Sequence, residues 1–164
     1  MSNSTALFAI TESELTRFWA KVDKSGECWN WTASKSRGYG HFHVGGRTLA
    51  AHRIAFMIEN GLVERSVHVD HLCFNRACVN PNHLRAVTPK ANQEHRKGPT
   101  RKSTTGVLGV TYRARWNRFE VCVYHHGKSR YGGAYATLAE AEAAAIAKRN
   151  ELYTHNDLDR DIAA

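Results

Sequence analysis

The sequence predicts an α+β fold in two domains, and three observations support this prediction. Runs with the alternation of β-strands and runs with the spacing of helices are interleaved along the 164 residues. Cysteine and histidine are concentrated in one turn-rich segment, residues 70–84. A stretch rich in Gly, Pro, Ser and Thr, residues 97–106, carries no apolar anchor and reads as a linker. We therefore expect a first domain at 1–97, a linker at 98–104 and a second domain at 105–164.

The first domain is predicted to alternate short helices and strands. Thr11 and Glu14 have the spacing of a capping box ahead of apolar residues at helical spacing. Gly45 and Gly46 are a hairpin signal between two strands. In chain order we expect a helix at 11–22, a strand at 27–33, strands on both sides of the Gly45-Gly46 turn, a helix at 50–59, a strand at 67–69 and a helix at 89–96.

The second domain is predicted to be a three-stranded antiparallel sheet followed by one helix. The strand-like runs are GVTYRAR, FEVCVYHH and KSRYGGAY, separated by turn-like segments, and Thr137 caps a helix that continues to Leu152. Cys122 lies between two valines in a predicted strand and is expected to be a core thiol. Lys148 and Arg149 are expected to face solvent beside the glutamates of the helix.

The charge distribution indicates a polyanionic partner. The chain has a net charge of +8 and an isoelectric point of about 9.6, and residues 98–130 alone carry a net charge of +6. Such a basic segment, interleaved with aromatic residues, is typical of nucleic-acid binding. No apolar run is long enough to span a membrane, and the first residues lack the features of a secretory signal. We expect an intracellular protein without a membrane partner, in which clustered Cys and His hold zinc in preference to disulfides.

The spacing of Cys73, Cys78 and His83 predicts a structural zinc site. Zinc prefers four thiolate or imidazole ligands in a tetrahedron, and this compact segment supplies three of them. Cys28 is the remaining cysteine outside the second domain and is the expected fourth ligand. The alternative is that these residues are buried free thiols beside an unrelated histidine.

The same segment also contains residues suited to phosphodiester chemistry. Asp70 and Asn92 offer a carboxylate and an amide oxygen, which are the hard ligands that Mg²⁺ prefers. His71, beside Asp70, is a candidate to deprotonate water. Each residue alone also has an ordinary structural interpretation: a cap, a core histidine and a helix-surface residue. Because strict strand alternation sends Asp70 and His71 to opposite faces, the strand must end or bend there.

From His52-Arg53 through VDHLC, CVNPNHL and on to Asn92, the sequence resembles the ββα-metal nucleases, specifically HNH endonucleases of phage and intron type. Its zinc-ligand spacing is also similar to that of His-Cys box homing endonucleases. Asp70 follows the HNH pattern of a metal-binding acidic residue before the base and departs from the His-Cys box pattern. The resemblance implies that His71 is the general base, Arg53 contacts phosphate, Asp70 and Asn92 bind a catalytic Mg²⁺ or another divalent ion, and Cys28, Cys73, Cys78 and His83 bind structural zinc.

Residues 105–153 resemble the AP2 DNA-binding domain, on the Gly109-Val110 pair, Phe119 and the YGGAY run that precedes the helix. A ribbon of strands fits the major groove of DNA, where arginines reach phosphates or guanine edges. Alternation puts Arg113 and Arg115 on one face. The alternative is a solvated basic sheet face. The predicted DNA-binding residues are Arg113, Arg115, Trp116, Arg118 and Arg130.

Taken together, these features predict a Mg-dependent HNH homing endonuclease that cuts double-stranded DNA in the cytoplasm of a bacterial host cell. One such site cuts one strand, so a double-strand break requires a homodimer or two successive cuts. The alternative is a zinc-containing, sequence-specific DNA-binding protein without catalysis. An RNA-directed nuclease is disfavoured because an arginine-bearing ribbon suits the B-form major groove better than the narrow groove of A-form RNA.

Overall fold

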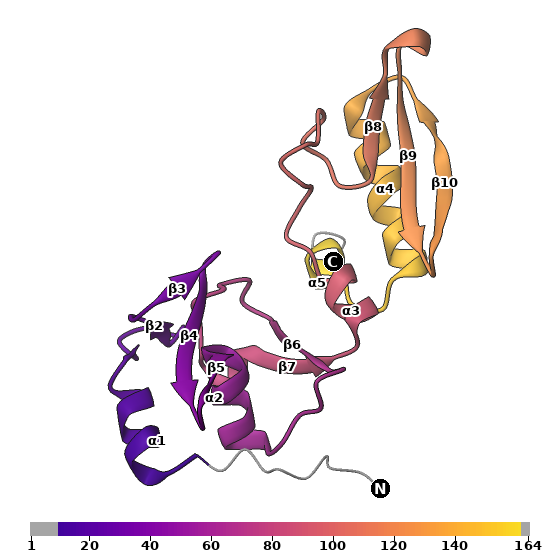
Figure 1. Cartoon of the computed structure of the whole chain (residues 1–164). Coiled ribbons are helices and arrows are strands. Elements are labelled where there is room, and N and C mark those ends of the chain that lie inside the picture. The colour runs from indigo at the N-terminus through magenta and orange to yellow at the C-terminus, as the bar shows by residue number, and fades with distance from the viewer. Residues whose placement is uncertain (1–9, 162–164) are drawn as a thin grey trace, which may run out of the picture. The chain divides into compact units, whose positions relative to one another are not determined.

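The computed structural model describes residues 10–161 and is a mixed α and β structure with several small sheets. The chain divides into two compact units, one up to Pro89 and the other from Lys90 onward (Figure 1). The predicted domain limits, with a linker at 98–104, remain a prediction. Within the described residues, no helix has both the length and the apolar character needed to cross a membrane.

Within residues 10–89, the first unit contains two α-helices and three small antiparallel sheets. One sheet has three strands in the order β3-β4-β5. The other two have two strands each, β1 with β2 and β6 with β7. Its elements are α1 (Glu12–Trp19), β1 (Val22–Asp23), β2 (Asn30–Trp31), β3 (Lys35–Ser36), β4 (Tyr39–Val44), β5 (Arg47–Ala50), α2 (Ala51–Asn60), β6 (His68–His71), the 3-10 turn η1 (Pro81–His83) and β7 (Leu84–Val87).

Local sequence signals start and end these elements as expected. Thr11 accepts from the backbone N–H of Glu14, and the Glu14 carboxylate accepts from the backbone N–H of Thr11, so the predicted capping box is present. Gly45 and Gly46 both have positive φ and form the turn between β4 and β5. The first helix is shorter than predicted, because the chain turns after α1 and Val22 pairs with Trp31 in the β1–β2 sheet.

Aromatic side chains form the core of the first unit. Phe18, Trp31 and Phe42 come from α1, β2 and β4, and their ring centroids lie 5.1–5.8 Å apart. Trp31 also lies against Gly40, where an added Cβ would come within 2.5 Å of the indole ring. A glycine is therefore required at this position of β4, because any side chain would displace the tryptophan.

The second unit is a three-stranded antiparallel sheet, in the order β10-β9-β8, with α4 packed on one face (Figure 1). The predicted sheet and helix are both present, and Thr137 caps α4 through a second capping box. The elements are α3 (Pro89–Glu94), which begins at the division, β8 (Val110–Arg113), the 3-10 turn η2 (Ala114–Trp116), β9 (Arg118–His125), β10 (Lys128–Tyr135), α4 (Leu138–Leu152) and α5 (Asp157–Asp161).

Three expectations for the second unit were wrong. Arg115 does not share a strand face with Arg113, because β8 ends at Arg113 and Arg115 lies in η2. Cys122 is half-buried, on the sheet face opposite the buried Val121 and Val123, because successive strand residues alternate between faces. Arg149 is only 4% exposed and forms a two-point ion pair with Asp159, at 2.6 and 2.8 Å, instead of facing solvent.

Candidate active site and metal centre

Cys28, Cys73, Cys78 and His83, the four predicted zinc ligands, come together in a cluster that could hold a metal ion. One ligand atom from each residue lies within 4.8 Å of all the others. Nδ1 of His83 lies 3.6 Å from Sγ of Cys28 and 3.6 Å from Sγ of Cys78. Tetrahedral zinc with ordinary Zn–S and Zn–N bonds requires a sulfur–nitrogen separation of about 3.6 Å. The donor set and its geometry therefore fit zinc.

Burial disfavours the free thiolate form of two of these cysteines. Burial raises the pKa of Cys78 to about 12, and burial also raises the pKa of Cys73. The backbone N–H of Asn80 donates to Sγ of Cys78 at 3.4 Å, as is common for a thiolate ligand. A bound zinc ion would hold all three sulfurs as thiolates and would join the segment around Cys28 to the β6–β7 region.

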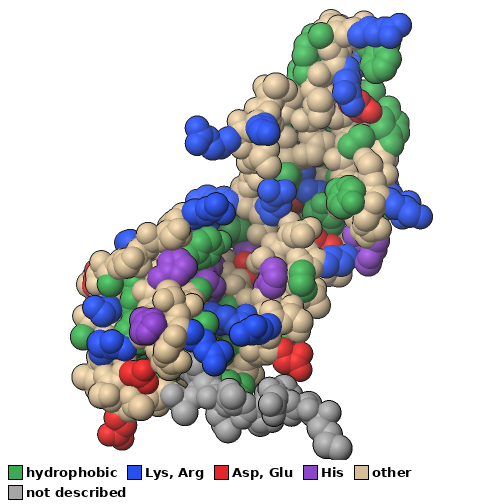
Figure 2. All heavy atoms as spheres, viewed as in Figure 1, with side chains coloured by type: hydrophobic (Ala, Val, Ile, Leu, Met, Phe, Trp, Pro, Cys, Tyr) green, Lys and Arg blue, Asp and Glu red, His purple; other side chains and the backbone are tan. Residues whose placement is uncertain are grey.

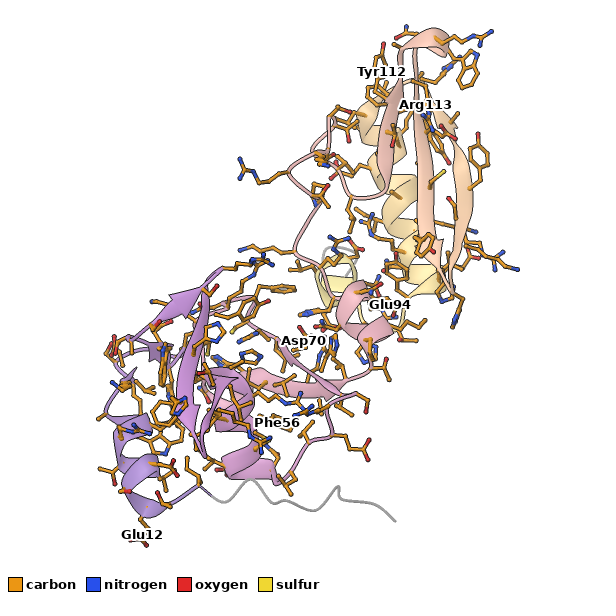
Figure 3. The ribbon with its side chains drawn as sticks, viewed as in Figure 1. Glu12, Phe56, Asp70, Glu94, Tyr112 and Arg113 are labelled. Carbon is orange, nitrogen blue, oxygen red and sulfur yellow. The ribbon has the colours of Figure 1, made fainter. Side chains whose placement is uncertain are left out.

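Asp70 and His71 are the last two residues of β6, and both are buried. The strand ends at His71, as expected from the sequence. Oδ1 of Asp70 accepts from the backbone N–H of His71 at 2.9 Å, and Oδ2 accepts from Nε of Arg85 at 3.2 Å. Arg85 is the cross-strand partner of Asp70 on β7. Figure 3 labels Asp70 in this strand pair.

One nitrogen of the His71 ring is engaged by the backbone. Nε2 lies 3.1 Å from the carbonyl oxygen of Cys78, and a carbonyl can only accept, so Nε2 carries the proton in the neutral ring. Nδ1 then carries the lone pair. Burial lowers the pKa of His71, more than the Cys78 carbonyl and Asp70 raise it. The neutral form, which can accept a proton, is therefore favoured near neutral pH.

Two further rings, from different elements, surround His71. His52, on α2, has its ring centroid 4.6 Å from that of His71, and Tyr39, on β4, lies 5.9 Å from His71 and 5.5 Å from His52. Figure 2 shows several histidine side chains on one face of the first unit, among lysine and arginine side chains. Tyr39 was missed by sequence reasoning, because nothing in its local pattern indicates contact with residues 13 and 32 positions away.

The other predicted catalytic residues are placed as follows. The Arg53 guanidinium donates to the backbone carbonyls of Val67, at 2.6 Å, Val63, at 2.8 Å, and Glu64. These contacts brace the loop before β6, and the phosphate contact of Arg53 remains a prediction. Asn92 lies on α3, in the second unit, whereas Asp70 and His71 both lie in the first unit.

The face of the second unit opposite α4 combines basic and aromatic residues. Arg113 and Arg118 are cross-strand partners there, and Arg113 pairs with Glu120 on the same face. Tyr124 and Tyr131, 64% and 62% exposed, also lie on this open face by the register of β9 with β10. Sequence reasoning did not select these two tyrosines. Figure 3 labels Arg113 and Tyr112 near the end of β8.

The remaining predicted DNA-binding residues lie elsewhere in the second unit. Arg115 and Trp116 are in η2, where Trp116 is 64% exposed and the guanidinium of Arg115 lies 5.9 Å from its ring centroid. Arg130 is the cross-strand partner of the buried Val123, so it lies on the side of the sheet that α4 covers.

The site belongs to an HNH endonuclease domain: residues 49–94 match the model of the HNH endonuclease family. This match contains the last two residues of β5 and all of α2, β6, η1, β7 and α3, and therefore Asp70, His71 and Asn92. The matched residues make up less than half of the chain.

Two curated proteins of Escherichia phage T7 are similar to part of the chain. Protein 7.7 is 38% identical over 69 residues, which cover 42% of this chain and 53% of that protein. Protein 2.8 is 37% identical over 75 residues, which cover 44% of this chain and 50% of that protein. The chain thus spans about half the length of these relatives. No solved structure matches it.

Proposed function

We propose that this protein is a DNA endonuclease of the HNH homing type, which hydrolyses phosphodiester bonds in double-stranded DNA with His71 as the general base. The observation that carries the proposal is the contact between Nε2 of His71 and the carbonyl of Cys78. It leaves the lone pair on Nδ1, one residue after a buried carboxylate and beside the zinc-type cluster. A neutral imidazole fixed in this tautomer can accept the proton of a water that attacks phosphorus.

The proposed ligands of a catalytic cation are Asp70 and Asn92. A carboxylate and an amide oxygen fit a hard divalent ion such as Mg²⁺. When bound, the ion would neutralise charge on the scissile phosphate and on the leaving 3′ oxygen. The contact of Oδ1 of Asp70 with the His71 N–H fixes the carboxylate at the end of β6. Arg85 reduces the cost of keeping this carboxylate charged while it is buried.

The second unit is the proposed DNA-positioning module, with an AP2-like role. Support comes from the net charge of +6 in residues 98–130 and from the open face that carries Arg113 and Arg118. Arg115 and Trp116 extend this surface into the exposed turn after β8. Such residues contribute phosphate contacts, which make binding dependent on salt.

Cleavage of supercoiled plasmid and phage DNA with Mg²⁺ tests the proposal. The zinc-loaded chain should give nicked or linear product, and His71→Ala should give none while it keeps its zinc and its DNA affinity. His43→Ala is the matched control, because His43 is an exposed histidine of β4 outside the ring cluster. Product formation by His71→Ala at the native rate would refute His71 as the base.

A non-catalytic DNA-binding protein is the second candidate, and the Asp70–Arg85 ion pair is the observation that favours it. A guanidinium bound to the carboxylate competes with a metal ion for the same oxygen. This candidate predicts tight DNA binding without cleavage by native and His71→Ala chains alike, on every substrate and divalent ion tried.

A further inference from the structure

We propose that His52 is a positioning residue, which holds the imidazole of His71 in the orientation that proton transfer requires. This inference rests on the proposed function of His71 and adds a residue to which neither the family match nor the sequence pattern gives a role. It is carried by the ring geometry and hydrogen bonds within the first unit.

The His71 ring is restrained through contacts with three separate segments. Cys78, in the cysteine-rich loop, accepts from Nε2 and fixes one edge of the ring. His52 lies against it from α2, with a centroid separation of 4.6 Å and an interplanar angle of 50°. Tyr39, on β4, is 5.9 Å away. A single hydrogen bond would leave the ring free to rotate about it, and the two neighbouring rings restrict that rotation.

His52 and His71 come from different elements of the first unit. His52 lies in the first turn of α2, and His71 is the last residue of β6. The contact between their rings therefore couples the start of the helix to the end of the strand.

One nitrogen of the His52 ring indicates that burial alone does not explain the residue. Nδ1 of His52 is buried without a hydrogen-bond partner among the described residues. A buried nitrogen of this kind is unfavourable, and an apolar ring would fill the same space without it. An imidazole at this position therefore carries a cost that packing alone does not require.

The charge state of His52 suits a ring that packs against another imidazole. Burial, followed by the nearby His71, lowers the pKa of His52 to about 3. His52 is therefore a neutral ring near neutral pH and adds no charge to the ring cluster.

Kinetics of the zinc-loaded full chain test this role. His52→Ala removes the ring that packs against His71, and we expect kcat to fall about a hundredfold, because misplacement of a reacting group by about 1 Å has this effect. KM for DNA and zinc content should not change. His52→Phe keeps a ring against His71 and should recover part of the loss. If His52 had only a structural role, His52→Ala would not lower kcat while leaving KM unchanged. His52→Phe would then not recover kcat selectively.

A measurement without DNA or a catalytic cation gives an independent readout. Long-range ¹H–¹⁵N correlation spectra of histidine-labelled protein report the tautomer of each ring. Native His71 should show the single Nε2–H form, and His52→Ala should show averaged signals. His52→Phe supplies this comparison if the alanine variant loses its zinc or its fold, and His43→Ala should resemble the native protein.

The outcomes separate this inference from the proposed function. Unchanged kcat and an unchanged His71 tautomer in His52→Ala would overturn the positioning role while cleavage by the native chain upholds the nuclease. A native chain that never cuts DNA would refute the nuclease. In that case a fixed tautomer that is lost in His52→Ala would still establish that His52 holds the ring, and an unaffected tautomer would refute it.

Discussion

The two units of this protein hold their functional groups in opposite ways. In the first unit, Asp70 and His71 are buried and restrained by backbone and ring contacts, and the cysteine cluster lies beside them. In the second unit, Arg118, Tyr124 and Tyr131 stand on an open sheet face. A catalytic site requires fixed side-chain geometry and limited access of water, whereas a surface that contacts a charged polymer requires long, exposed side chains. Substitutions should accordingly have large effects in the first unit and graded effects in the second.

The largest expected effect is the loss of zinc. Cys73→Ser removes one ligand, and because structural zinc sites contribute on the order of 10 kcal/mol to folding, we expect the first unit to unfold. Three of the four tryptophans lie in that unit, so their fluorescence reports its unfolding. Cys122→Ser, in the second unit, is the control and should retain one zinc per chain. A folded Cys73→Ser chain with full zinc would contradict the assignment of the cluster.

A smaller loss is expected from Gly40→Ala, which tests how tightly the aromatic core is packed. The added Cβ would meet the Trp31 ring at 2.5 Å, and overpacking of this kind costs about 1–3 kcal/mol. Gly26→Ala is the control, because an added Cβ there has nothing within 4 Å. Chemical denaturation followed by tryptophan fluorescence measures both. Equal stability of the two variants would show that the core rearranges to accept the added methyl group at little cost.

Arg118→Ala should weaken DNA binding without affecting cleavage at saturating DNA. Loss of one phosphate contact lowers the slope of log affinity against log salt by about 1. Arg130→Ala is the matched comparison, because the register places Arg130 on the side of the sheet covered by α4. Fluorescence anisotropy at several salt concentrations separates them. If Arg130→Ala has the larger effect, the open face is not the DNA-binding surface.

The smallest expected effect is the loss of a helix cap, which should be similar in the two units. Thr11→Ala and Thr137→Ala each remove a side chain that accepts from a backbone N–H, at a cost of about 1 kcal/mol. Differential scanning calorimetry of the zinc-loaded chain measures both. A loss several times larger in either unit would mean that the cap has a tertiary role that its local contacts do not reveal.

Local rules made much of the fold and the metal site predictable. The capping box at Thr11, the turn at Gly45-Gly46 and the strand–helix order of the second unit follow from short-range chemistry. Cys73, Cys78 and His83 were identifiable because one short segment supplies three ligands, and the structure brings Cys28 to them.

The remaining features depend on contacts between distant segments. The three carbonyls that bind Arg53 and the ion pair that buries Arg149 are tertiary contacts, which no local pattern reveals. The ring cluster of Tyr39, His52 and His71 joins a strand, a helix and a second strand. The position of Cys122 on the face opposite Val121 and Val123 follows from strand alternation. The sequence already contained this signal, and the prediction of a core thiol overlooked it.

Cys78 belongs to two sites through two different atoms. Its sulfur is part of the metal cluster, and its carbonyl oxygen holds the proton on Nε2 of His71. Oxidation of that sulfur to sulfenic acid or beyond would release the metal and shift the carbonyl with it. The proposed enzyme would then lose the orientation of its proton acceptor although His71 itself is chemically untouched. Its cleavage activity should therefore respond to the redox state of its surroundings.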